Sequence, residues 1–176
     1  MKPAFLVSVL VAALFMCAGE GLCGEDGLSL GYGFAAFNRG KETGEVEGDK
    51  SYDFAQVKYL YELPFQWKGL ALLVEPFASY VADPATGTDL GVGIGFKYYL
   101  LAADRGLYIM GGSGMAYSTI GFQEQGTHLF FIGQGGVGYR FGRFFIEDRF
   151  RHYSNGGTAA PNWSVNANIF SVGTYF

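Results

Sequence analysis

Eight segments of the chain alternate between apolar residues and polar or small residues with a period of two. Such alternation is typical of a β-strand whose two faces meet different surroundings. The segments are approximately 27–38, 52–63, 70–81, 88–100, 106–117, 127–141, 143–154 and 165–176. Each is close to the ~9–11 residues that a tilted strand needs to cross a bilayer. The pattern therefore predicts an all-β fold, an eight-stranded antiparallel up-and-down transmembrane β-barrel.

Segment 88–100 shows the two faces most clearly. One face is apolar or aromatic throughout and comprises Leu90, Val92, Ile94, Phe96, Tyr98 and Leu100. The other face carries three glycines, Lys97 and Tyr99. Segment 52–63 follows the same rule, with Lys58 and Glu62 on its polar face. An apolar outer face and a small or polar inner face suit a membrane barrel, whereas a soluble barrel would reverse them.

The composition agrees with a membrane barrel. Apolar residues make up 49% of the chain and aromatic residues 18%, while only 16% are charged. A soluble domain usually has about a quarter of its residues charged. Beyond the N-terminal segment no apolar run is long enough to span a bilayer as a helix. The net charge of −4 argues against a nucleic-acid partner, which would favour a basic face.

The N-terminal segment has the pattern of a secretory signal peptide. Lys2 supplies the positive charge, and residues 5–16 form a short apolar stretch. Small residues follow, so we expect cleavage near residues 19–23, after Gly19 or Cys23. The expected division is a signal peptide over 1–23 and an outer-membrane barrel over 24–176.

The cysteines raise one alternative for this segment. Cys17 could be the acylated residue of a lipoprotein, but that requires a small preceding residue, and Met16 is not small. Because Cys17 and Cys23 both lie in or beside the expected signal peptide, no disulfide framework is predicted. No metal site is predicted either, since the only histidines, His128 and His152, are far apart in sequence.

The connections between the predicted strands alternate in length. Those after the odd-numbered strands are long or polar and cover about 39–51, 82–87, 118–126 and 155–164. Those after the even-numbered strands are shorter and cover 64–69, 101–105 and a tight turn at Gly142. Outer-membrane barrels have short periplasmic turns and longer external loops, so we expect the odd-numbered connections to face outward. The terminal Phe176 resembles the assembly signal of bacterial outer-membrane barrels.

A glycine pattern in segment 127–141 raises a nucleotide-binding alternative. Gly133, Gly135 and Gly138 spell GxGxxG. A dinucleotide site needs this motif between a strand and a helix. Here the motif lies within a predicted strand and another strand follows, so small residues that ease barrel packing are the better interpretation.

Segment 143–154 carries the polar residues of greatest chemical interest. Its predicted interior face holds Phe145, Glu147, Arg149, Arg151 and Tyr153. Its predicted lipid face holds Phe144, Ile146, Asp148, Phe150, His152 and Ser154. Polar side chains that face lipid lack water as a partner, although this cost falls near the interface. The placement of His152 and Ser154 on the lipid face, near the outer rim, therefore suggests that these two residues have a functional role.

The chemistry of this pair favours nucleophilic catalysis. A serine hydroxyl is a poor nucleophile until a base takes its proton, and histidine is suited to that task. The i, i+2 spacing places His152 and Ser154 on one face, about 7 Å apart along the strand. On the lipid face of the next strand, Asn166 falls close to His152 and could accept a hydrogen bond from its ring. A pair of interfacial polar residues without a catalytic role is the alternative.

The sequence from His152 to Gly157, His-Tyr-Ser-Asn-Gly-Gly, followed by Pro161-Asn162, resembles the signature of the lipid A 3-O-deacylases, the PagL-like outer-membrane acyl hydrolases. The resemblance implies a cofactor-independent ester hydrolase that removes a 3-hydroxyacyl chain from lipid A. It implies Ser154 as nucleophile, His152 as general base, and Asn155 with the Gly156–Gly157 backbone at the oxyanion hole. Where this chain has Asn166, the best-known member of the family has a glutamate.

Several interpretations stay open at this point. The deacylase would act at the outer rim of the barrel, on lipid A of the outer leaflet, with the acyl chain along the wall beside Phe150 and Phe144. A non-catalytic barrel, acting as an adhesin or a structural surface protein, is the alternative function. A narrow pore is a third, although the interior charges suggest a plugged lumen. His128 is predicted to be structural and to face the interior, and the sequence leaves open whether the chain forms a homodimer.

Overall fold

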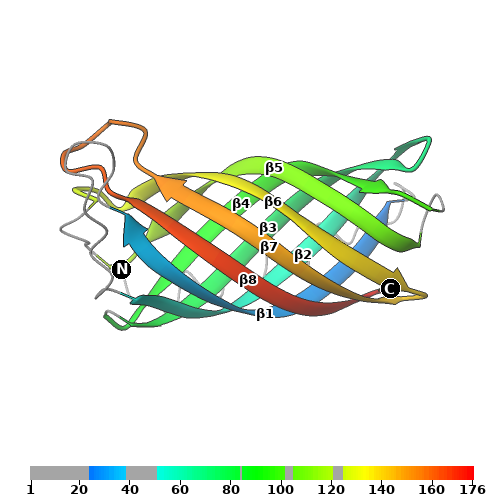
Figure 1. Cartoon of the computed structure of the whole chain (residues 1–176), viewed down its shortest axis with the longest axis horizontal. Helices are drawn as coiled ribbons and strands as arrows, with labels where there is room; N and C mark the ends of the chain where they lie inside the picture. Colours follow the sequence, from blue (N-terminus) through cyan, green and yellow to red (C-terminus); the bar gives the residue numbers. More distant parts are fainter. Residues whose placement is uncertain (1–23, 39–50, 84, 102–104, 121–124) are drawn as a thin grey trace.

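The computed structural model describes residues 24–38, 51–83, 85–101, 105–120 and 125–176. The expected signal peptide at 1–23 lies outside them. The eight predicted strands are present and form a closed barrel in which each strand is antiparallel to its neighbours and β1 pairs with β8 (Figure 1). They are β1 Glu25–Asn38, β2 Ser51–Trp67, β3 Leu70–Asp83, β4 Gly87–Tyr99, β5 Gly106–Ser118, β6 Leu129–Phe141, β7 Phe144–Ser154 and β8 Ser164–Tyr175. The predicted fold class is confirmed.

The connection predicted at 64–69 is wrong, because β2 continues to Trp67. Proline cannot donate to a β-ladder, which is why Pro64 reads as the end of a strand. In the structure Pro64 lies where the register between β2 and β3 shifts, between Glu62 and Gln66. A bulge of this kind tolerates a residue without an N–H group. The turn shrinks to Lys68 and Gly69, both with positive φ, at 49° and 84°.

The pairing register fixes how the strands incline. One row of paired residues runs Ser51, Ala36, Asn166, His152, Gly133, Ser113, Ile94, Val74 and Tyr61. The row leaves β2 at Ser51 and returns to it at Tyr61, ten residues along the strand. Eight strands with this stagger incline at roughly 40° to the barrel axis. We call the end with the β2–β3, β4–β5 and β6–β7 connections the turn end, and the opposite end the loop end.

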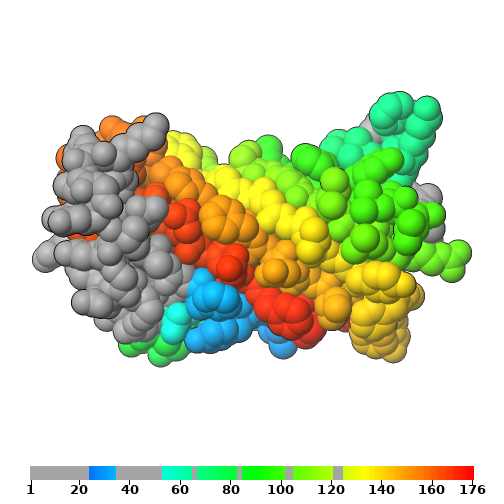
Figure 2. All heavy atoms as spheres, viewed as in Figure 1, coloured from blue at the N-terminus to red at the C-terminus, as the bar shows by residue number. Residues whose placement is uncertain are grey.

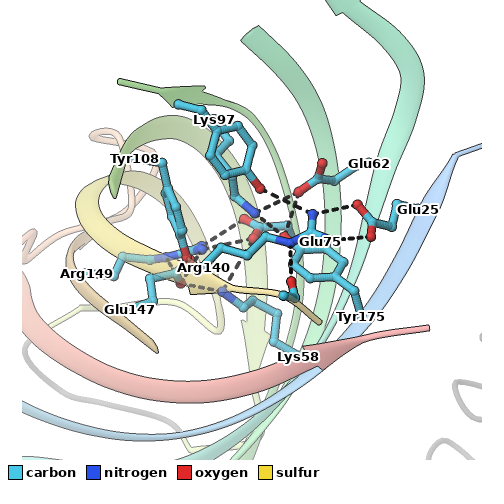
Figure 3. Close-up of polar contacts among 12 residues, drawn as sticks. Glu25, Lys58, Glu62, Glu75, Lys97, Tyr108, Arg140, Glu147, Arg149 and Tyr175 are labelled. Atoms are coloured by element: carbon cyan, nitrogen blue, oxygen red, sulfur yellow. Dashed lines mark hydrogen bonds and ion pairs between the residues drawn. The ribbon is translucent and has the colours of Figure 1, made fainter. Parts of the chain in front are cut away.

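Charged side chains fill the half of the barrel interior towards the turn end (Figure 3). Lys58 Nζ lies 2.7 Å from Glu147 Oε1, and Arg149 Nη1 lies 2.8 Å from Glu75 Oε2. These four side chains are at most 2% exposed. A buried charge is tolerated when it is paired and hydrogen-bonded. Each of these four charged groups has a partner of opposite charge inside the barrel.

The other half of the interior, towards the loop end, holds a large apolar cluster, beside which Arg151 and Asp89 are also buried. Its core consists of Phe54, Phe77, Val81, Ala116, Ile120, Phe130, Ile132, Tyr153, Val165, Ala167 and Ile169. The sequence predicted small or polar inner faces and missed this cluster. Glycines make room for it, because a Cβ atom at Gly33 would overlap the ring of Phe54. Tyr153, Val165 and Ala167 support the inner side of the wall whose outer side carries His152 and Asn166.

The outer wall is apolar, as the alternation predicted. On β4, Val92, Ile94, Phe96 and Tyr98 are each at least 40% exposed, while Lys97 between them is fully buried. Figure 2 shows the side chains of β6, β7 and β8 next to one another on this wall. Among the described residues there is no helix with the length and hydropathy to cross a membrane.

Candidate active site

The β7–β8 hairpin places His152 and Asn166 directly opposite each other. Both side chains point to the outer wall and both are partly buried. The distance from His152 Nδ1 to Asn166 Oδ1 is 2.8 Å. Because an amide oxygen can only accept a hydrogen bond, Nδ1 carries the proton and Nε2 presents a lone pair. The ring is therefore held in the tautomer that a general base requires.

Ser154 is the last residue of β7 and shares the outer face with His152. It is partly buried and lies opposite Phe131 of β6. Within the described residues its hydroxyl makes no hydrogen bond, including none to His152. The structure thus joins His152 to Asn166 by a hydrogen bond and places Ser154 on the same face. The Ser154 hydroxyl and the His152 ring are not hydrogen-bonded to each other.

Asn155 organises the loop that follows Ser154. Its Nδ2 donates to the carbonyl oxygens of Gln125 at 2.7 Å, Ala159 at 2.9 Å and Pro161 at 3.1 Å. Its Oδ1 accepts the N–H of Gly157 at 2.8 Å. The side chain is fully buried, so these bonds are shielded from water.

The backbone donors of this loop are unequally available. The Asn155 N–H donates to Asn162 Oδ1 at 3.0 Å, and the Gly157 N–H is held by Asn155. Gly156 has a φ of 63°, a conformation that favours glycine. Its N–H has no partner among the described residues, and a Cβ atom at this position would lie 2.9 Å from the ring of Phe131. Of the three predicted oxyanion positions, Gly156 is the one whose N–H is unoccupied.

Two contributors escaped the sequence interpretation. Asn162 belongs to the Pro161-Asn162 motif, but only the structure gives it a task, as acceptor for the Asn155 N–H. Gln125 supplies a backbone carbonyl from the β5–β6 connection, thirty residues before Asn155. No local pattern connects residues in two separate loops.

The prediction for His128 is wrong in part. Strand β6 begins at Leu129, so the alternation that would turn His128 inward does not reach it. The side chain is exposed and its ring stacks on that of Tyr117, with 5.6 Å between the ring centroids. Nδ1 lies 2.8 Å from the carbonyl oxygen of Ser118, so the residue joins β5 to the start of β6.

The structure also bears on the ligand classes considered earlier. Gly133, Gly135 and Gly138 lie within β6, and strand β7 follows, which rules out the strand–glycine–helix arrangement of a dinucleotide site. In the described residues, no group of three or more His, Cys, Asp or Glu side chains is placed to hold a metal ion.

Comparison with known proteins points to one family. The model of the family described as lipid A 3-O-deacylase (PagL) matches residues 52–175. No curated protein matches the chain. The crystal structure of the outer membrane enzyme PagL superposes with a TM-score of 0.66 at 19% identity, covering 83% of this chain and 98% of that one.

Other barrels share the fold at lower similarity. Ail, the attachment invasion locus protein of Yersinia pestis, has a TM-score of 0.55 at 15% identity, with 87% of this chain and 99% of that one covered. The N-terminal barrel domain of Pseudomonas aeruginosa OprF has a TM-score of 0.54 at 14% identity and the same coverage. At these identities the superpositions establish the eight-stranded architecture alone.

Proposed function

The chain belongs to the lipid A 3-O-deacylase (PagL) family of outer-membrane barrel enzymes, and on this premise we propose that it hydrolyses the ester of the 3-hydroxyacyl chain at the 3-O position of lipid A. The observation that carries the proposal is the hydrogen bond between His152 and Asn166 on the outer wall. Ser154 lies two residues after His152 on the same face of β7. An ordered imidazole next to a serine on a lipid-facing surface suits an ester that is buried in lipid.

Hydrolysis takes place in two steps. The Oγ of Ser154 attacks the ester carbonyl carbon while Nε2 of His152 takes the hydroxyl proton. His152 returns that proton to the leaving sugar oxygen, and an acyl-serine remains. A water molecule, deprotonated by the same nitrogen, then attacks the acyl carbon and releases the fatty acid and Ser154. A rotation about the Ser154 Cα–Cβ bond brings the hydroxyl towards the imidazole, and such contacts often close only when substrate binds.

The oxyanion formed in each step needs hydrogen-bond donors in fixed positions. We assign the N–H of Gly156 to this role, because it has no partner among the described residues and follows Ser154 closely. Asn155 and Gly157, the other predicted positions, contribute by holding the loop in its conformation. The negative charge of the oxyanion would be stabilised by a donor that is already in position, so the loop would not need to rearrange.

The strand register suggests a path for the acyl chain. Rows of paired residues descend towards the turn end in the order β8, β7, β6, β5. A line parallel to the axis from Ser154 therefore crosses β6 near Gly133 and β5 near Gly111. A Cβ atom at Gly133 would meet nothing within 4 Å, so the wall is open there. The path leads over β6, and of the two flanking aromatics named from sequence only Phe150, paired with Gly135, borders it.

Phe96 lies across the lower part of this path. Its ring stands 3.1 Å from the position that a Cβ atom of Gly111 would take. Phe96 is 42% exposed on the outer wall. The open stretch between Ser154 and the Phe96 ring therefore accommodates the first part of an extended fatty acyl chain, which lies in contact with apolar side chains.

The orientation follows from the chemistry of the substrate. Lipid A occupies the outer leaflet, so the loop end, where Ser154 lies, faces outward in our proposal. The start of β1 and the end of β8, which lie at the turn end, then face the periplasm, as short turns and long external loops also suggest. Residues 1–23 act as a signal peptide that directs the chain to export.

The proposed function is tested by expressing the protein in a host that makes lipopolysaccharide and measuring lipid A by mass spectrometry. We expect lipid A to lose one 3-hydroxyacyl group, specifically from the 3-O position. The variants Ser154→Ala and His152→Ala should leave lipid A intact while the barrel still assembles. Unchanged lipid A with well-assembled wild-type protein would overturn the proposal and favour a non-catalytic barrel.

A further inference from the structure

An apolar groove lies on the outer wall of β2 to β5, on the turn-end side of the proposed acyl path. Its volume is about 450 Å³, which falls in the range of small-ligand pockets, about 300–1,000 Å³. Side chains of four strands line it, among them Leu63 of β2, Leu72 and Val74 of β3, Ile94 of β4 and Ser113 of β5. A fatty acyl chain in this groove would contact apolar side chains along most of its length.

Lys68, in the turn between β2 and β3, lies at the membrane interface opposite the candidate active site. The line parallel to the axis that passes Ser154, Gly133 and Gly111 shifts by one strand and about two residues at each step. Continued in the same way, the line passes Tyr98 on β4 and reaches Lys68. Each step descends roughly 7–8 Å, so Lys68 lies roughly 30 Å from Ser154 along the axis. Because the hydrocarbon core of a bilayer is about 30 Å thick, Lys68 reaches the interface at the turn end.

The surroundings of Lys68 form a cationic and aromatic rim below the groove. Lys68 is exposed and has no hydrogen bond or ion pair in the part of the chain that the structure describes. Its Nζ lies 5.2 Å from the centroid of the Trp67 ring, and Trp67 is 59% exposed, as is typical of an interfacial girdle. The Tyr99 N–H donates to the Gly69 carbonyl oxygen at 2.9 Å, so the end of β4 lies beside this turn. The β4–β5 connection that follows adds a second exposed cation, Arg105.

We propose that the groove and this rim bind an anionic glycerophospholipid of the periplasmic leaflet, with the phosphate beside Lys68 and Arg105 and an acyl chain in the groove. Leu72 follows Lys68 by four residues, which places the groove roughly 10 Å from the cation along the axis. The glycerol and the first methylene groups of the lipid span that interval. Cations at a membrane surface attract anionic lipids, whereas a zwitterionic headgroup carries its own compensating charge.

The lipid site goes beyond the proposed hydrolysis of lipid A. It requires a barrel that spans the membrane with its turn end at the periplasmic leaflet, and it involves neither Ser154 nor His152. A loss of lipid binding and a loss of deacylation are therefore measured separately.

The two tryptophans of the chain allow a direct test, because Trp67 lies at the turn end and Trp163 precedes β8 at the loop end. In the variant Trp163→Phe, quenching of the Trp67 fluorescence reports brominated lipids that contact the proposed site. The full-length barrel is inserted into phosphatidylcholine vesicles that contain a small fraction of brominated phosphatidylglycerol or of brominated phosphatidylcholine. We expect phosphatidylglycerol to associate at least roughly fivefold more strongly, the effect of one cation beside an anionic headgroup. Equal association of the two lipids would overturn the proposal.

Charge variants and the second tryptophan identify the site. The double variant Lys68→Gln, Arg105→Gln should lose the preference for phosphatidylglycerol, whereas Lys68→Arg, Arg105→Lys, which keeps both charges, should retain it. In the variant Trp67→Phe, Trp163 reports the other rim and should show no preference. A preference that persists without the two cations, or that is equally strong at Trp163, would refute the site.

Filling the groove tests the position of the acyl chain. Ser113→Phe adds a ring inside the groove, and Met115→Phe, at a 43% exposed position outside it on the same face of β5, is the matched control. We expect Ser113→Phe to weaken phosphatidylglycerol association about threefold or more, because packing contacts are lost, and Met115→Phe to leave it unchanged. Heat-modifiable migration verifies that both variants fold. Equal association in the two folded variants would refute the groove as the acyl site, and slower deacylation in Ser113→Phe alone would then assign the groove to the end of the lipid A chain.

Discussion

His152 on β7 and Asn166 on β8 stand opposite each other across the last hairpin and share a hydrogen bond of 2.8 Å between Nδ1 and Oδ1. The bond fixes the imidazole on the outer wall with Nε2 free to act as a base. An amide oxygen orients the ring, but it lacks the charge with which a carboxylate stabilises imidazolium.

Replacing Asn166 separates these two contributions. We expect Asn166→Ala to lower kcat by roughly tenfold or more, because the ring loses its orienting partner. Asn166→Glu should raise kcat by a comparable factor, because a carboxylate stabilises the imidazolium formed in the transition state. The rate of fatty acid release from purified lipid A measures both effects. Equal rates in the wild type and both variants would remove Asn166 from the mechanism.

Asn155 provides the test of the loop to which we assign the oxyanion donor. Asn155→Ala removes the bonds to Gln125 and Gly157, so the Gly156 N–H loses its fixed position. We expect kcat to fall about 100-fold, the cost of a lost oxyanion donor, with little change in KM. Thr158→Ala is the control, since its hydroxyl also bonds within the loop, to the Asn155 carbonyl oxygen at 2.7 Å. A loss in Thr158→Ala as large as in Asn155→Ala would mean that general loop order matters rather than the donor.

The proposed acyl path is tested by filling it. Gly133→Leu adds a side chain into open space, so the barrel should assemble normally. The added side chain should displace the substrate chain and lower kcat/KM by roughly tenfold or more. Val137→Leu, on the same outward face of β6 but off the path, is the matched control and should retain activity. Full activity in Gly133→Leu would place the acyl chain elsewhere on the wall.

The interior charges predict a stability effect without a direct effect on catalysis. Arg149→Met leaves Glu75 and Glu147 without their guanidinium partner inside the barrel. Removal of one partner of a buried pair costs about 3–5 kcal/mol, and we expect that loss in urea-induced unfolding from vesicles. Arg143→Met, at the exposed β6–β7 turn, should change the free energy of unfolding by less than about 0.5 kcal/mol. The folded Arg149→Met protein should retain its activity per molecule.

The strands and their faces could be predicted because lipid imposes one simple demand. Every second residue must be apolar, and every second residue from Leu90 to Leu100 is apolar or aromatic. The same period placed His152 and Ser154 on the outer wall and Asn166 beside them. Alternation fails where a residue leaves the strand, as at His128, or where a bulge absorbs a proline, as at Pro64.

The remaining features depend on contacts between distant parts of the chain. The stagger of ten residues follows only from the pairing of all eight strands. Because of this stagger, the residue that lies next to Ser154 in the direction of the turn end is Gly133 on β6, and Phe144 at the far end of β7 is not on that line. The bonds of Asn155 depend on the shape of two loops that meet at Gln125. Likewise, the apolar inner cluster needs the closed barrel, since its side chains come from β2, β3, β5, β6, β7 and β8.

Chemical labelling of Ser154 tests the central claim most directly. Detergent-solubilised protein is treated with an alkyl fluorophosphonate, which reacts covalently with activated serines, and the modified residue is identified by peptide mass spectrometry. The proposed mechanism predicts one adduct, on Ser154, formed in parallel with the loss of deacylase activity and greatly slowed in His152→Ala. Inhibition with the adduct on another residue, or deacylation that persists in Ser154→Ala, would contradict it.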